Sequence, residues 1–375
     1  MKINDGVLKN DEKAIFALRS LYRSYGYSQY KMSKFEEYDL YAENKSFLIS
    51  DSIITFTGSG GKLMALKPDV TLSIVKSTKD MPGCVNKVYY NENVYRAEGG
   101  DRDFKEIMQA GLECIGEIDD YSLSEVIMLA AKSLDIISED FVLDISHLGI
   151  VAEAIGRLGV TAQGKAQILS AIADKNLHSA MSVCESEGVD EKDSILLKNI
   201  INCYGDPKKV LGELEPLLSE GKGKESADEL KRVLSLIEES VPMEKIRLDF
   251  SVAGDMNYYS GVVWSGFVKG VSKSILSGGQ YNNLLRKMGK RSGAAGFALY
   301  LDLLQELDGE KNEYDVDTLI LYDENTNIKS LRALADEISG KGLSVTAQKA
   351  VPEKLKFKKL IKITESGVET VEGYA

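Results

Sequence analysis

The sequence has few of the residues on which common catalytic and metal sites depend. It contains two histidines and four cysteines in 375 residues. His147 and His178 have no partner at H-E-x-x-H spacing, and no G-x-S-x-G segment occurs. None of the cysteines forms a C-x-x-C pair. We therefore expect locally hydrogen-bonded or surface histidines, small buried thiols without disulfides, and neither a bound metal nor a cofactor.

Long apolar runs and an excess of positive charge are also absent. The apolar run Val126–Ala131 is ended by Lys132, and Met1–Asp5 carries charge where a signal peptide needs an apolar core. These features predict a cytoplasmic protein without a membrane partner. The formal net charge is −12, whereas proteins that grip nucleic acid usually present a basic face. The charge argues against nucleic acid as the main partner, although a local basic patch could still bind tRNA.

The composition is that of a globular protein, with 43% hydrophobic and 28% charged residues. Mixed helix and strand patterns over 1–146 and 244–310 predict one core domain that is interrupted by a helical insertion domain, 147–243. A small α/β domain is expected over 311–375. Strands, then helices, then strands again indicate an α+β fold with an antiparallel or mixed sheet.

Local periodicity predicts the main elements of the core. The first block has a helix over Asp11–Tyr25, with Ile15, Leu18, Leu21 and Tyr22 on one face and Gly26 as its stop signal. Further core elements are predicted as strands Ile53–Thr57, Lys87–Tyr95, Arg247–Phe250, Val262–Phe267 and Ser274–Leu276, a helix Leu123–Leu134, and helices that begin near Gly278 and Ala294.

The same periodicity predicts helices throughout the insertion and an alternating pattern in the last block. The insertion helices are expected at Val151–Leu158, Lys165–Ile172, Ser194–Cys203, Lys208–Ser219 and Ala227–Glu239. The last block is expected to form strand Thr318–Tyr322, helix Ile328–Ser339, strand Leu343–Gln348, and a solvated strand or short helix over the lysine-rich run 354–362.

The glycine-rich segment Gly58–Lys62 resembles a phosphate-binding loop only superficially. Leu63 stands where such a loop needs a serine or threonine, and the upstream glycine spacing is wrong. We expect a hairpin turn between two strands.

Several polar residues could together bind a small zwitterion. Gln109 and Glu113 alternate on a predicted strand and therefore share a face. Arg96 lies on a neighbouring predicted strand. An amide and a guanidinium could hold a carboxylate, and the carboxylates of Asp69 and Glu113 could accept from an ammonium or an imidazole N–H. A sheet with one polar face would also explain the alternation.

In this order, the segments resemble the class II aminoacyl-tRNA synthetase core, and specifically histidyl-tRNA synthetase, from about Ser24 to Leu304. Gly26–Glu36 is similar to the first class II motif, and Arg96 with Gln109 and Glu113 to the second. Asp255–Gly261 is similar to the histidine-specific tyrosine loop and Gly296–Leu304 to the third motif. The resemblance implies a histidine-like pocket formed by Asp69, Thr71, Arg96, Gln109, Glu113, Tyr258 and Tyr259.

The chain departs from the synthetase pattern where cationic groups would contact phosphate. Leu303 replaces the arginine of the third motif, Val252–Asn257 contains no arginine before Tyr258, and the expected Gly-Gly-Arg-Tyr has Gln280. Ser33 replaces the proline that supports the family's dimer interface. These departures imply that adenylation is lost, because losing one charged donor costs ~2–4 kcal/mol of transition-state stabilisation.

The histidyl-tRNA synthetase family includes a non-catalytic branch, the regulatory subunits of ATP phosphoribosyltransferase. The resemblance to that branch implies an allosteric subunit that binds a short-form catalytic subunit, is needed for its activity and transmits histidine feedback in histidine biosynthesis. A homodimer within a hetero-oligomer is implied as well. Two alternatives remain open: a true synthetase whose arginines come from Arg102, Arg286 or Arg291, and a paralogue that binds tRNA or modifies a protein.

Overall fold

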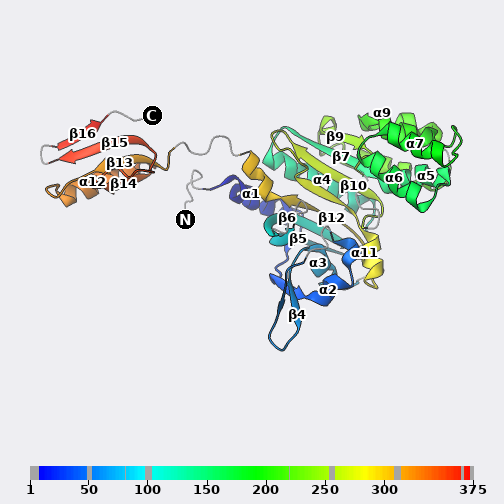
Figure 1. Ribbon diagram of the computed structural model, residues 1–375, viewed down its shortest axis with the longest axis horizontal. Helices are drawn as coiled ribbons and strands as arrows, with labels where there is room; N and C mark the ends of the chain where they lie inside the picture. Colours follow the sequence, from blue (N-terminus) through cyan, green and yellow to red (C-terminus); the bar gives the residue numbers. More distant parts are fainter. Residues whose placement is uncertain are drawn as a thin grey trace. The chain divides into compact units, whose positions relative to one another are not determined.

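The computed structural model divides the chain into two compact units, Met1–Leu307 and Asp308–Ala375, each described by itself. Figure 1 shows the course of the chain through both units. The structure describes residues 8–48, 53–80, 82–97, 104–218, 220–252, 258–307, 314–364 and 367–371.

The first unit is built on a mixed sheet that contains nine strands in the described part of the chain. β1 runs parallel to β5 and β7 runs parallel to β9, while the other neighbours are antiparallel. This confirms the predicted α+β class with a mixed sheet. From edge to edge the strands are β1 (Ser28–Gln29), β5 (Val85–Ala97), β6 (Phe104–Gly116), β12 (Gly293–Tyr300), β11 (Leu276–Gln280), β10 (Val262–Val268), β7 (Phe141–His147), β9 (Ile246–Asp249) and β8 (Tyr204–Gly205).

One face of the sheet packs against α1 (Asn10–Ser24) and α4 (Asp120–Ile137). The helix predicted over Asp11–Tyr25 is confirmed to within one residue, and it buries Ala14, Leu18 and Tyr22. Gly26 follows with a φ of 81°, a left-handed conformation that glycine adopts readily. The largest buried side chain on this side is Trp264 of β10.

The opposite face carries smaller elements that form a second apolar core. They are α2 (Tyr38–Ala42), η1 (Lys45–Phe47), α3 (Thr71–Ser77), α11 (Asn282–Lys287) and a small sheet of β2 (Phe35–Glu37), β4 (Leu63–Leu66) and β3 (Thr55–Thr57). Gly60 and Gly61 have φ values of 86° and 78° in the β3–β4 turn. The predicted hairpin is therefore confirmed, because a β-hairpin turn commonly needs positive φ.

The segment between β7 and β9 is almost entirely helical and belongs to the first unit. Its helix α10 (Gly221–Ile237) packs against α4, and α5 (Leu148–Leu158) packs against α10. The sequence missed one helix, α7, and the short edge strand β8. The α7 segment contains His178 and three serines, which lower helix propensity, and it begins at the side-chain cap of Asn176. The helices are α5 (Leu148–Leu158), α6 (Ala162–Ala173), α7 (Leu177–Ser186), α8 (Ile195–Asn202), α9 (Pro207–Leu214), η2 (Glu215–Leu217) and α10 (Gly221–Ile237), with η3 (Met243–Lys245) before β9.

Two predicted core helices are wrong. Gly278 lies in β11 and Ala294 lies in β12, so α11 begins only at Asn282. The strand predicted from Ser274 begins at Leu276. A Cβ atom on Gly278 would lie 2.5 Å from the carbonyl oxygen of Gly296. Gly278 therefore permits close packing in the centre of the sheet, which local helical spacing does not reveal.

Over 314–364 and 367–371, the second unit forms a four-stranded sheet in the order β14-β13-β15-β16, with one helix against it. The predicted strand–helix–strand order is confirmed, and the lysine-rich run enters a strand whose Lys358, Lys359 and Lys362 are exposed. The elements are β13 (Val316–Leu321), α12 (Ile328–Gly340), β14 (Val345–Gln348), β15 (Phe357–Thr364) and β16 (Gly367–Val371). The short helix η4 (Leu301–Glu306) belongs to the first unit, near its end.

The residues predicted to lack special chemistry have ordinary surroundings. All four cysteines are free, with Cys84 exposed and the other three buried. His147 is buried and hydrogen-bonded, whereas His178 is exposed. Within the described ranges, no helix is long and apolar enough to cross a membrane, and no group of three or more potential ligands is arranged to hold a metal ion.

Candidate functional site

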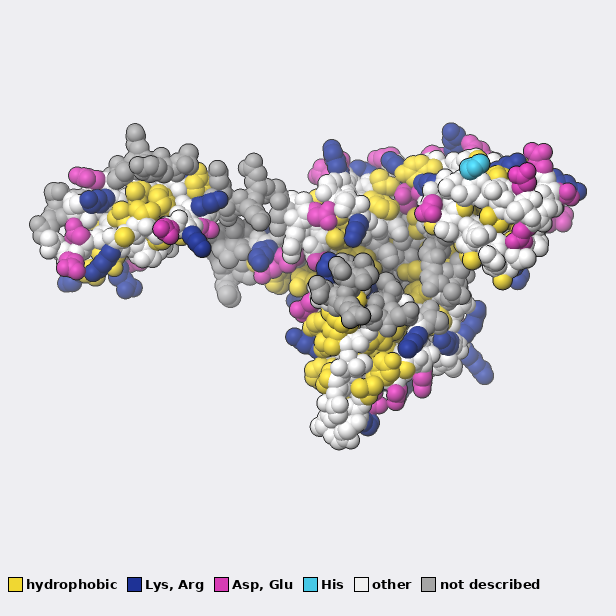
Figure 2. All heavy atoms as spheres, in the orientation of Figure 1, with side chains coloured by type: hydrophobic (Ala, Val, Ile, Leu, Met, Phe, Trp, Pro, Cys, Tyr) yellow, Lys and Arg dark blue, Asp and Glu magenta, His cyan; other side chains and the backbone are white. Residues whose placement is uncertain are grey.

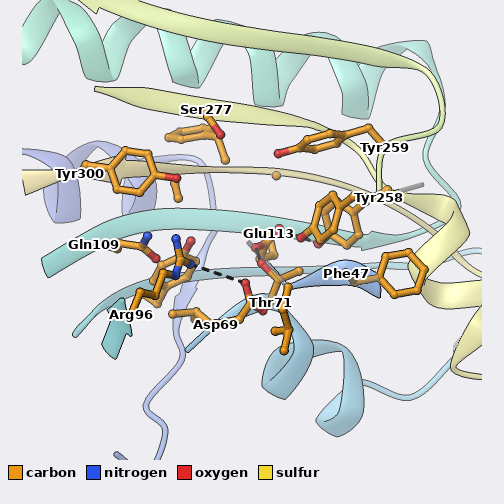
Figure 3. A pocket seen from close by; sticks show the side chains of 17 residues that line it. Phe47, Asp69, Thr71, Arg96, Gln109, Glu113, Tyr258, Tyr259, Ser277 and Tyr300 are labelled. Atoms are coloured by element: carbon orange, nitrogen blue, oxygen red, sulfur yellow. Dashed lines mark hydrogen bonds and ion pairs between the residues drawn. The ribbon is translucent and has the colours of Figure 1, made fainter. Parts of the chain in front are cut away.

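A cavity of about 390 Å³ opens on the side of the main sheet that carries α3. Figure 3 shows its polar side chains converging from β5, β6 and the start of α3, with Tyr258 and Tyr259 at one end and Tyr300 at the other. The structure brings all seven residues predicted from the sequence to this one cavity: Asp69, Thr71, Arg96, Gln109, Glu113, Tyr258 and Tyr259.

Glu113 lies at the centre of the cavity wall and is 2% exposed. Its carboxylate accepts hydrogen bonds from Thr71 Oγ1 at 2.7 Å and from the Tyr281 hydroxyl at 2.5 Å. Burial raises the pKa of Glu113 to about 8, because desolvation outweighs these two donors and Asp69 adds repulsion. Glu113 is therefore a buried acid that has no cationic partner among the described residues.

Asp69 precedes α3, and its position is set by the helix it begins. Its Oδ1 accepts from the backbone N–H of Leu72 at 2.8 Å, which caps the first turn. Its Oδ2 lies 3.9 Å from the Arg96 guanidinium. Burial nevertheless raises the pKa of Asp69. The pair Asp69 and Glu113 thus offers two buried acceptors to a cationic or N–H-bearing ligand.

Arg96 and Gln109 supply the donors. Arg96 is 6% exposed and is anchored by its Nε, which donates to the Pro68 carbonyl at 2.6 Å. Gln109 is 2% exposed, and its Nε2 has no hydrogen-bond partner within the described part of the chain. An unsatisfied buried amide costs about 1–3 kcal/mol. A ligand carboxylate at this end of the cavity would satisfy it.

Aromatic rings line the other end. Tyr258 stacks edge-on against Tyr259 with ring centroids 4.7 Å apart, and it also contacts Tyr281 at 5.8 Å and Phe47 at 6.0 Å. Such a wall favours a flat ring. The residues Ala253–Asn257, which include most of the predicted arginine-free run and the start of the tyrosine loop, lie outside the described residues.

Several lining residues were missed by the sequence interpretation. They are Phe47, Tyr90, Ser277, Tyr281 and Tyr300. Tyr281 directly follows the Gly-Gly-Gln segment, so its position was noticed, but its hydrogen bond to Glu113 joins residues 168 positions apart. Gly296 was noticed as part of a motif. Its role here is steric, because a Cβ atom would overlap the Glu113 carboxylate.

Three of the residues at which the chain departs from the synthetase pattern, Leu303, Gln280 and Ser33, are described by the structure and do not line the cavity. Leu303 is in η4 and packs against the main core. Gln280, the last residue of β11, lines a separate cleft, whereas the next residue, Tyr281, lines the cavity. Ser33 accepts a hydrogen bond from the backbone of Phe35.

Two of the three arginines considered as substitutes for the missing ones can be placed relative to the cavity. Neither Arg286 nor Arg291 lines the cavity, and Arg102 lies outside the described residues. Among the cavity-lining residues that the structure describes, Arg96 is the one lysine or arginine. The described cavity therefore suits recognition of one carboxylate better than neutralisation of a triphosphate.

The raised pKa of Glu113 predicts a pH effect on stability. Between the ordinary value near 4.5 and about 8, the folded state retains a proton that the unfolded state has lost, so rising pH destabilises the fold. We expect Glu113→Gln to reduce the loss of unfolding free energy between pH 5 and pH 8 by up to roughly 4 kcal/mol. Urea titrations at both pH values measure this. Glu106→Gln, an exposed site on the same strand, should follow the wild type; parallel behaviour of Glu113→Gln would contradict the prediction.

Comparison with known proteins finds the same relationship along most of the chain. The sequence model of the histidyl-tRNA synthetase family matches residues 7–304. Over 291 residues, the chain is 31% identical to the ATP phosphoribosyltransferase regulatory subunit of Caldanaerobacter subterraneus subsp. tengcongensis, covering 76% of this chain and 75% of that protein.

Solved structures show the same fold. A crystal structure described as an ATP phosphoribosyltransferase regulatory subunit/histidyl-tRNA synthetase from Bacillus halodurans C has a TM-score of 0.72 at 24% identity, covering 92% of this chain and 91% of that one. A chain of the ATP phosphoribosyl transferase (HisG:HisZ) complex from Thermotoga maritima has a TM-score of 0.61 at 18% identity, covering 80% and 98%. These likenesses confirm the predicted class II synthetase-like fold.

Proposed function

The chain belongs to the histidyl-tRNA synthetase-like family of ATP phosphoribosyltransferase regulatory subunits of histidine biosynthesis, and from this premise we propose that it is a non-catalytic histidine sensor. It binds histidine in the described cavity, activates a short-form catalytic subunit and transmits feedback inhibition to it. The observation that carries the proposal is the cavity itself, which pairs buried acceptors with a single described cation.

Histidine fits the polarity of this cavity. Its ammonium group would donate to the Asp69 carboxylate, and its own carboxylate would accept hydrogen bonds from Arg96 and Gln109. The imidazole ring would lie against Tyr258 with one N–H directed at Glu113. This arrangement satisfies the unpartnered Gln109 amide and gives the buried Glu113 a donor, which favours its ionised form.

The partner of the proposed subunit is a short-form ATP phosphoribosyltransferase catalytic chain. The Thermotoga maritima structure is described as a HisG:HisZ complex, and this chain shares the fold of one of its chains. An amino-acid sensor without adenylation chemistry needs a second chain that performs the reaction. We propose that the two chains assemble into a hetero-oligomer.

We also infer a homodimer within that assembly. The small β2-β4-β3 sheet exposes Phe35 (47%) and Phe56 (40%), whose rings pack edge-on 5.7 Å apart. Figure 2 shows hydrophobic side chains gathered at the base of this projecting hairpin. Phe35 falls within the segment that resembles the first class II motif, the usual dimer region of that family. A second copy would cover these rings.

Reconstitution tests the proposal directly. Purified chain added to a short-form catalytic subunit should raise phosphoribosyl transfer at least about tenfold, because the catalytic chain lacks its own regulatory part. Added histidine should then inhibit the complex. Turnover of ATP and phosphoribosyl pyrophosphate, followed by absorbance of the product, measures both effects. Size-exclusion chromatography of the mixture should show a complex larger than either component. Absence of both complex and activation would refute the assignment.

A further inference from the structure

A second cleft lies behind the proposed histidine cavity and shares a wall with it. Its volume is about 790 Å³, and it lies between α5, α10 and the ends of β10 and β11. Tyr281 faces the histidine cavity, while its neighbour Gln280 faces the second cleft. In the same way, Tyr259 lines the histidine cavity and Ser260 lines the second cleft. Neighbouring residues of this wall therefore line different cavities, so a shift of its backbone would alter both.

Gln280 connects the shared wall to the helical insertion. Its Oε1 accepts from the backbone N–H of Val262 at 2.7 Å, and its Nε2 lies 3.5 Å from Glu229 Oε1 on α10. Gly261 leaves the space for this side chain, since a Cβ there would overlap Gln280 Oε1. Gln280 is 8% exposed, so its amide is held in this orientation by packing as well as by hydrogen bonds.

Glu229 in turn contacts the start of α5. His147 Nδ1 accepts from the Gly149 N–H at 3.0 Å, so the ring proton is on Nε2, which lies 3.2 Å from Glu229 Oε2. The hydrogen bond from His147 is the largest influence that lowers the pKa of Glu229. One carboxylate therefore joins β11, α10 and the β7–α5 junction.

The loop that carries the cavity tyrosines makes a second connection. The Ser260 N–H donates to the Gln280 carbonyl at 2.9 Å, and the Leu148 N–H donates to the Gly261 carbonyl at 2.9 Å. Leu148 is the first residue of α5. The loop after Tyr258 and Tyr259 is thus bonded both to β11 and to the insertion.

We propose that Gln280 is a positioning residue that transmits occupancy of the histidine cavity to the helical insertion through Glu229 and His147. The proposal rests on the proposed histidine site. A ligand N–H that donates to the Glu113 carboxylate changes the hydrogen bond that this carboxylate accepts from the Tyr281 hydroxyl. Because Tyr281 directly follows Gln280, the backbone transmits the movement to Gln280. Glu229 then shifts with it, which moves α10 relative to α5. The insertion, rather than the C-terminal unit, is the part of the chain that reports histidine to the catalytic subunit.

The test separates histidine binding from its consequence in the full complex with the catalytic subunit. Gln280→Met keeps the length of the side chain but removes both amide contacts, and Glu229→Gln keeps the size but removes the charge. Both variants should bind histidine within about threefold of wild type by calorimetry, while maximal feedback inhibition falls by more than half. Glu225→Gln, on the same helix and in the same cleft, is the matched control and should behave as wild type.

Hydrogen exchange supplies a second readout that merely lowered stability would not reproduce. Histidine should change the protection of α10 amides in wild type and in Glu225→Gln, and the change should be absent in both test variants. Normal inhibition and normal protection changes in Gln280→Met and Glu229→Gln would overturn the relay while leaving the histidine site intact. Failure of wild type to bind histidine would overturn both. If Gln280→Met does not fold, Glu229→Gln, half-buried on α10, decides the outcome alone.

Discussion

Replacing Glu113 with alanine is expected to abolish the response to histidine. The substitution removes the acceptor for a ligand N–H and leaves the Tyr281 hydroxyl and Thr71 Oγ1 without their shared partner. Losing a buried hydrogen bond to a charged acceptor costs about 1.5–3 kcal/mol, or roughly 10-fold or more in affinity. Isothermal titration with histidine and inhibition curves of the reconstituted complex measure the effect. Asp69→Ala should act in the same direction.

A surface substitution on the same strand is the matched control for this prediction. Glu106 lies on β6 and accepts from Asn93 and Tyr95 in the exposed part of the strand. Glu106→Ala should leave histidine affinity and feedback within about twofold of wild type. Unchanged inhibition in Glu113→Ala and Asp69→Ala together would show that the cavity is vestigial and that histidine is sensed on the catalytic partner.

The second large effect concerns the reaction that the fold resembles. We expect no histidine-dependent ATP–pyrophosphate exchange, with a rate at least about 10³-fold below that of a working synthetase. Each missing charged donor costs ~2–4 kcal/mol of transition-state stabilisation. Within the described cavity, Arg96 is the single lysine or arginine, and it is already held by Pro68 and Asp69.

The exchange assay also discriminates against the main alternative function. A true histidyl-tRNA synthetase would exchange pyrophosphate into ATP when histidine is added, whatever arginines it uses. A positive control synthetase in the same buffer excludes an inactive assay, and histidine binding by calorimetry excludes an unfolded sample. Robust exchange by this chain would replace the regulatory proposal with an enzymatic one.

The sequence predicted the elements whose signals are local. Strand period two placed Gln109 and Glu113 on one face, and both line the cavity. The apolar spacing of α1 and the glycine after it predicted that helix closely. Such signals survive because the side-chain direction along a helix or strand depends on the backbone period alone.

Prediction failed where packing overrides local preference. Gly278 and Ala294 were assigned to helices, but both lie in central strands. At Gly278 a larger residue would collide with Gly296 and Phe297 of β12. The helix α7 was missed because its polar residues weaken the apolar pattern, whereas contacts with α6 and α8 stabilise it.

The same distinction between local signals and distant contacts applies to the residues of the candidate site. Its seven predicted residues came from separate segments and were grouped by family resemblance together with the chemistry of donors and acceptors. The missed ones, such as Phe47 and Tyr281, join the cavity through contacts between distant segments. Nothing in the spacing of the sequence indicates which hydroxyl will reach a given carboxylate.

By itself, the sequence determined the fold class, the kinship and the residue types that a histidine-like ligand needs. Only the tertiary structure decided the state and use of those residues. Burial without a described cation raises the pKa of Glu113 to about 8, and the neighbouring residues Gln280 and Tyr281 line different cavities at the end of β11. Both properties depend on the exclusion of solvent and on contacts between residues that are far apart in the sequence. Neither property exists until the chain has folded.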